Sequence, residues 1–170
     1  CDFEDGSHPF CGWSQDSGDD GDDLQWTRVN SATGGSTGPR GDHTTGNGHY
    51  MYVDTSSGLL QEGQKARLLS PPLPPNRSPE CCLTFWYHMY GSGVGTPGLN
   101  VYVRENGETL LWSRSGHQGG QWLLAEVTLP TFSTKPFQVV FEGTRGGGSR
   151  GGIALDDISL STHIEGPCNQ

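Results

Sequence analysis

The sequence is poor in basic residues and in long apolar runs. Lys and Arg together number 10, against 19 Asp and Glu, so the net charge is −9 at pH 7. A chain this acidic repels nucleic acid and anionic lipid, and we expect neither as a partner. No stretch approaches the roughly 20 apolar residues of a transmembrane helix, so we expect no direct membrane insertion.

Patterns of metal-binding and catalytic motifs are also missing or incomplete. None of the five cysteines has C-x-x-C spacing, which argues against structural zinc, and no H-E-x-x-H is present. Gly147–Gly151 matches the G-x-S-x-G nucleophile elbow, but a strand rather than a helix is expected after it. Gly93–Gly98 matches G-x-G-x-x-G, yet again a strand is expected where a phosphate site needs a helix N-terminus. We therefore predict no catalytic residues and no enzyme activity.

Glycine and proline are abundant, and the apolar residues alternate. The chain has 170 residues, 27 Gly and 11 Pro, and it shows no clean helical period. We predict one all-β domain, a sandwich of two antiparallel sheets with about ten strands. Strands are expected at residues 1–4, 24–29, 49–54, 64–70, 81–90, 99–104, 109–113, 121–129, 137–142 and 153–160. Asn106-Gly107 predicts a tight turn between two of these strands.

Residues 137–160 organise the pattern. Two apolar, β-branched runs flank the glycine-rich loop 143–152, and the second run carries the adjacent carboxylates Asp156 and Asp157. A buried carboxylate is costly unless hydrogen bonds, a basic side chain or a metal ion compensate it.

The strand at 81–90 has two distinct faces. Alternation places Leu83, Phe85, Tyr87 and Met89 on one face, which we expect to be core, and Trp86, His88 and Tyr90 on the other. His88 is either a ligand or an ordinary solvent-facing or hydrogen-bonded histidine. Tyr50 and Tyr52 are expected to share one face of their strand in the same way.

Several polar segments have two readings. The acidic segment 14–23 is either a solvated loop or a source of one or two calcium ligands, although its spacing is not that of an EF-hand. Arg40-Gly41-Asp42 matches the tripeptide that integrins bind, provided that it lies on an exposed loop tip. Asn76-Arg-Ser78 is an N-glycosylation sequon, which agrees with secretion, although Pro79 weakens it.

The chain resembles the MAM domain, a module shared by meprins, neuropilins and mu-type receptor tyrosine phosphatases. The resemblance covers essentially residues 1–168 and is closest, at 82–91 and 137–143, to glycolipid-anchored adhesion proteins with immunoglobulin domains. Its carriers are Cys1-Asp-Phe-Glu4 with Cys11-Gly-Trp13, Asp22–Trp26, Glu62–Pro71, Cys82–Gly91, Phe137–Gly143 and Ile153–Ile158. We interpret residues 1–168 as a single domain excised from a larger extracellular protein, with 169–170 as a tail.

This resemblance implies a jelly-roll-like fold and two disulfides, Cys1–Cys11 and Cys82–Cys168. Cysteines near both termini suit an oxidising compartment. Cys81 departs from the family pattern. By alternation it faces the core side, so we expect a buried free thiol rather than an intermolecular disulfide.

The resemblance also gives the carboxylates a role. It places acids at Glu4 and Asp156, where some family members hold a metal ion. We therefore expect a structural calcium site that uses Glu4 and Asp156, with Asp5, Asp23 or Asp157 as further ligands. The alternative is a hydrogen-bonded carboxylate network with Arg67 or backbone amides.

The function that the resemblance implies is a non-catalytic extracellular interaction module for adhesion, oligomerisation or receptor assembly. Its partners would be extracellular or cell-surface proteins, including a second copy of the chain. Trp86, Tyr90 and Trp112 are candidate contact aromatics, or else they pack under neighbouring loops. The alternatives are calcium-assisted glycan binding, an integrin ligand, or a spacer between domains.

Overall fold

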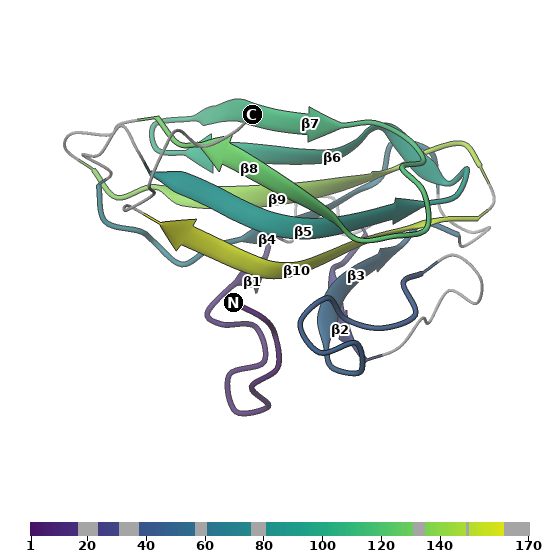
Figure 1. The fold of residues 1–170 in the computed structure, drawn as a ribbon. Coiled ribbons are helices and arrows are strands. Elements are labelled where there is room, and N and C mark those ends of the chain that lie inside the picture. The colour runs from purple at the N-terminus through teal and green to yellow at the C-terminus, as the bar shows by residue number, and fades with distance from the viewer. Residues whose placement is uncertain are drawn as a thin grey trace.

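The computed structural model describes residues 1–16, 24–30, 38–56, 61–75, 81–130, 135–148 and 150–161, apart from the side chains of residues 96 and 97. These ranges contain ten strands in two layers (Figure 1). No helix that could span a membrane occurs among them. The strands are β1 (Ser14–Gln15), β2 (Thr27–Val29), β3 (Tyr50–Asp54), β4 (Lys65–Leu69), β5 (Cys82–Tyr90), β6 (Val94–Arg104), β7 (Glu108–Arg114), β8 (Leu123–Thr128), β9 (Gln138–Arg145) and β10 (Gly152–Ser161).

Each layer is an antiparallel sheet of five strands. One has the order β1-β4-β9-β6-β7, and the other has the order β2-β3-β10-β5-β8. Neighbours in a sheet are mostly distant in sequence, so the chain crosses repeatedly between the layers, as in a jelly roll. The predicted all-β sandwich is confirmed. The stretch 137–160 supplies β9 and β10, which are the middle strands of the two sheets.

The core lies between β5 and β9. Leu83, Phe85 and Met89 are fully buried, and Tyr87 is 4% exposed, so the predicted core face is confirmed. Phe85 meets Phe141 of β9 edge to face, with ring centroids 4.9 Å apart. Tyr50 and Tyr52 belong instead to a smaller cluster on the outer side of β3 and β10.

The hairpin between β6 and β7 also has the predicted turn. Arg104 pairs with Glu108, and Gly107 has φ +132° between them. However, β6 begins at Val94, five residues earlier than expected. At Gly95 the chain passes so close to β9 that an added Cβ would lie 2.8 Å from the Thr144 carbonyl oxygen. The glycines of this segment therefore permit close strand packing, and they do not form a phosphate loop.

The prediction of a strand at residues 1–4 is wrong, although Phe3 is fully buried. Phe3 and Cys11 have positive φ values of 58° and 50°, and the Cys1–Cys11 disulfide closes the segment into a loop. Positive φ interrupts the extended backbone that a strand requires. The same loop is tied to β10, because Cys1 and Ile158 exchange two backbone hydrogen bonds.

Candidate functional site

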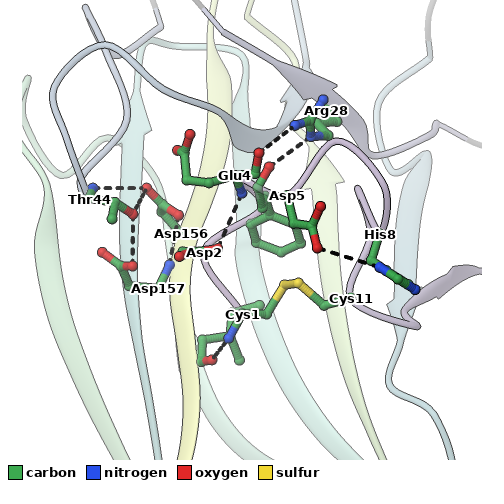
Figure 2. The surroundings of a disulfide bond; sticks show 12 residues. Cys1, Asp2, Glu4, Asp5, His8, Cys11, Arg28, Thr44, Asp156 and Asp157 are labelled. Atoms are coloured by element: carbon green, nitrogen blue, oxygen red, sulfur yellow. Dashed lines mark hydrogen bonds and ion pairs between the residues drawn. A yellow bond between two sulfur atoms is a disulfide. The ribbon is translucent and has the colours of Figure 1, made fainter.

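A bulge in β10 brings Asp156 and Asp157 to one loop. In a regular strand, adjacent side chains point to opposite faces. Here the pairing of β10 with β5 shifts register between Asp156 and Ser159, and Asp157 has φ 47°. Figure 2 shows both carboxylates beside Thr44, whose hydroxyl donates to each of them, at 3.3 Å to Asp156 and 2.8 Å to Asp157. The bulge therefore joins β10 to the segment 38–48, which we call the covering loop.

Asp156 is completely buried under this loop. Its Oδ2 accepts hydrogen bonds from the backbone N–H groups of His43, at 2.8 Å, and Thr44, at 3.3 Å. Burial raises the pKa of Asp156 to about 7, and the backbone hydrogen bonds only partly oppose that rise. Its neighbour Asp157 lies 2.6 Å from His43 Nδ1. Backbone amides thus supply most of the hydrogen bonds to Asp156, but they only partly offset its burial.

Asp42 holds the covering loop closed on itself. This carboxylate is 4% exposed and accepts from Thr45 N at 2.7 Å, Thr45 Oγ1 at 3.1 Å and Gly48 N at 2.5 Å. Burial raises the pKa of Asp42, but these hydrogen bonds outweigh burial and bring the pKa below its usual value. The Glu4 carboxyl is hydrogen-bonded to it and also accepts from His49 N at 2.7 Å. A Cβ at Gly48 would collide with the Glu4 carboxylate in its present position, so a larger residue there would displace that carboxylate.

This geometry contradicts the integrin interpretation of Arg40-Gly41-Asp42. Arg40 is exposed, but the Asp42 carboxylate is buried and engaged by the loop's own donors. An integrin ligand must present its aspartate at an exposed loop tip. Here the aspartate side chain is buried and accepts hydrogen bonds from its own loop.

Of the expected calcium ligands, the structure brings some together and not others. Glu4 lies beside Asp42 and accepts from His49 N, and Asp156 lies beside Asp157 and accepts from His43 N. Asp5 is exposed and turns towards His8 (Figure 2). Hydrogen bonds from Ser7 lower the pKa of Asp5 to about 2. Asp23 lies outside the described residues.

The donor chemistry of this site fits a hard cation, since buried carboxylate oxygens are what calcium binds. In the part of the chain that the structure describes, however, the carboxylates are not arranged as a complete set of metal ligands. Among the described residues, no group of three or more Asp, Glu, His and Cys side chains is placed to hold a metal ion. Arg67 is not part of the site either. It pairs with Asp16, Glu108 and Glu142 on the outer side of the other sheet.

The candidate contact aromatics have separate environments. Trp86 is half-buried, and His43 stacks on it with ring centroids 3.7 Å apart. Trp112 makes edge-to-face contacts with Phe85 and Tyr87 of β5 at the margin of the core, so it packs against a strand rather than under a loop. Tyr90 is half-buried at the rim of a hollow on the outer side of β5.

That hollow has a volume of about 550 Å³. Trp122 forms one wall, and its indole N–H donates to the Gly41 carbonyl of the covering loop at 3.0 Å. Sequence reasoning did not single out Trp122, because the residue precedes β8 and carries no motif. His88 lines the hollow and is 3% exposed. Burial lowers the pKa of His88, so the ring is neutral at pH 7.

The cysteines are partly described. Cys1 and Cys11 form a disulfide, and Cys81 is a buried free thiol whose pKa is raised by burial. Cys168 lies outside the described residues, so the Cys82–Cys168 bridge stays a prediction. Asn76 also lies outside them.

Comparisons with known proteins agree on the family. A family model described as MAM domain, meprin/A5/mu matches residues 1–169. MAM domain-containing glycosylphosphatidylinositol anchor protein 2 of Rattus norvegicus is 42% identical, over 99% of this chain and 18% of that protein. Neuropilin-1 of Xenopus laevis is 44% identical, over 96% of this chain and 17% of that protein. The chain thus spans less than a fifth of the length of these relatives.

Solved structures are similar in fold alone. The K1 cleaved adhesin domain of Lys-gingipain from Porphyromonas gingivalis has a TM-score of 0.62 at 17% identity, over 96% of this chain and 97% of that one. TmCBM61 in complex with beta-1,4-galactotriose has a TM-score of 0.58 at 16% identity, over 91% and 90%.

Proposed function

The chain belongs to the MAM domain family, and from that membership we propose that it is a non-catalytic extracellular module that binds other proteins. The names of its relatives support this proposal, since one is a glycosylphosphatidylinositol anchor protein and another is a neuropilin. Such an anchor holds a protein at a membrane surface without a transmembrane helix. Adhesion, oligomerisation and receptor assembly are all forms of this activity, and we take self-association as the form to test first.

The observation that carries the proposal is an apolar patch on edge strand β8. Leu124 is 48% exposed and lies directly opposite Trp86 of β5 in the register. Directly opposed residues share one face of a sheet, so Leu124 lies beside Trp86 on the outer side, where the Trp86 ring is half-buried under His43. Aromatic and aliphatic side chains in the centre of a contact supply most of an interface's free energy.

Sedimentation velocity over a wide concentration range tests self-association. We expect a concentration-dependent dimer for the 170-residue chain and a monomer for Leu124→Glu. The substitution would place a new carboxylate in the dimer interface, where it would be buried without a partner. The matched control is Leu110→Glu. Leu110 is 51% exposed on β7, the edge strand of the other sheet. A wild-type chain that stays monomeric, or equal loss in both variants, would refute self-association through this patch.

We also propose that calcium binds at the covering loop and stabilises the module. Support comes from three carboxylates that contact one loop: those of Asp42 and Asp156 are buried, and that of Glu4 is partly exposed. An ion that binds only the folded chain must raise its stability by mass action. A melting temperature that is the same in calcium and in chelator would refute this proposal.

A further inference from the structure

The hollow between Trp122 and Tyr90 has the build of a small-ligand site. Its volume of about 550 Å³ lies within the roughly 300–1,000 Å³ of small-molecule sites. Its walls combine the two aromatic rings with the polar side chains of Arg40 and Gln121. Four glycines complete the lining, which leaves backbone amide and carbonyl groups without side chains beside them: Gly38, Gly41, Gly46 and Gly120.

The two rings are held in place by contacts that lie behind and beside them. Trp122 is fixed by its hydrogen bond to Gly41 and by edge-to-face contacts with Tyr50 and His88, at 5.7 and 5.8 Å between centroids. Tyr90 meets His117 edge to face at 4.8 Å. Rings fixed before binding lose little conformational freedom when a ligand stacks on them. A stacking ligand is therefore favoured over one that must reorganise the wall.

Charge at the hollow comes from one accessible side chain. Arg40 is exposed and, among the described residues, makes no hydrogen bond or ion pair. Asp42 contributes to the wall, but its oxygens are engaged by Thr45 and Gly48. His88 is buried there, and its Nδ1 has no hydrogen-bond partner in the part of the chain that is described. The site thus offers the Arg40 guanidinium and the Gln121 amide beside the two aromatic rings.

We propose that this hollow binds a sugar that carries a carboxylate, such as a uronic acid at the end of a glycan. The C–H face of a pyranose ring is apolar and flat enough to stack on Trp122 or Tyr90. Its hydroxyl groups meet Gln121 and the glycine backbone. The carboxylate pairs with the Arg40 guanidinium, which binds carboxylates in a bidentate geometry. The net charge of −9 disfavours long polyanions, so a single acidic sugar unit fits better than a sulfated polymer.

The test is a titration of the 170-residue chain with methyl β-D-glucuronide and methyl β-D-glucoside, followed by NMR. The two ligands differ only in the carboxylate. We expect the glucuronide to bind at least about tenfold more tightly, since a charge-assisted hydrogen bond has about that effect. Arg40→Ala should remove this preference, and Tyr90→Ala should weaken both ligands. The matched control is Arg150→Ala, an exposed arginine that does not line the hollow and should change nothing.

Four results would overturn the proposal. These are no binding of the glucuronide, equal binding of the glucoside, equal weakening by Arg150→Ala, and lactate binding as tightly as the glucuronide. The last result would show that the site binds any carboxylate and makes no contact with the sugar ring. Because Tyr90 touches His117, a melting curve of each variant must first match the wild type, and Gln121→Ala at the exposed rim serves as the second variant if Tyr90→Ala does not fold.

Discussion

Replacing Asp42 by alanine should destabilise the folded chain by about 2–4 kcal/mol. The carboxylate accepts three hydrogen bonds within the covering loop, and hydrogen bonds to charged groups contribute roughly 1.5–3 kcal/mol each, with incomplete additivity. The variant also leaves the N–H of Gly48, a buried residue, without its acceptor. For a chain of this size, the change corresponds to a melting temperature lower by roughly 5–15 °C.

The assay is urea unfolding followed by tryptophan fluorescence, in chelator so that calcium does not contribute. Asp42→Asn is the first control, because it retains one oxygen acceptor and should lose less stability than the alanine variant. Arg40→Ala is the second. Its side chain is exposed and makes no ion pair among the described residues, so stability should change by less than about 0.5 kcal/mol.

The reasoning fails if Asp42→Ala has the midpoint and slope of the wild type. That result would mean that the carboxylate is not engaged in the loop, and an exposed aspartate would make the integrin interpretation tenable again. A changed dependence of the unfolding free energy on urea concentration, with an unchanged midpoint, would indicate an altered unfolded state. The free energy of unfolding in water would then be calculated for each variant from its own slope and midpoint.

Three further predictions test other parts of the molecule. Thiol titration in denaturant without reductant should find one thiol, Cys81, if the predicted Cys82–Cys168 bridge is present, and three if it is absent; the native chain should react slowly. The pKa of His88 lies below its usual 6.5, so the unfolded state binds the proton more tightly; stability should fall as the pH drops below about 6.5, and His88→Gln should flatten that dependence in urea titrations. Arg67→Met should lower the free energy of unfolding by roughly 3 kcal/mol, because the buried Glu142 loses its closest cation. Thermal unfolding measures this loss, and an unchanged melting temperature would show that the ion pair is not formed in solution.

The strands and their faces could be predicted because a period of two residues is a local signal. Leu83, Phe85 and Met89 alternate with outward-facing residues, and all three are fully buried. The same rule placed Tyr50 and Tyr52 together. It failed at residues 1–4, where alternation around Phe3 suggested a strand. There the disulfide and two positive φ values determine the backbone, and neither is visible in an alternating pattern.

The candidate site was only half predictable. Resemblance to the family pointed to Glu4 and Asp156, but Asp42 was assigned to a different motif. Its actual role depends on the three-dimensional path of the covering loop. A local signal did exist, since Asp42 followed three residues later by Thr45, with Gly46 and Gly48 beyond, is typical of a turn whose aspartate binds its own backbone.

The bulge at Asp157 explains why the two halves of the site depend on each other. Without it, Asp156 and Asp157 would point to opposite sides of β10, and only one could reach the covering loop. Positive φ is unfavourable for an ordinary residue but least so for Asp and Asn. The hydrogen bond from the Thr44 hydroxyl and the contact with His43 stabilise Asp157 in that conformation. The covering loop in turn lines the hollow through Gly41, whose carbonyl accepts the hydrogen bond from Trp122. Loss of the bulge should therefore disturb the sugar site that we propose, even though no residue of the bulge lines it.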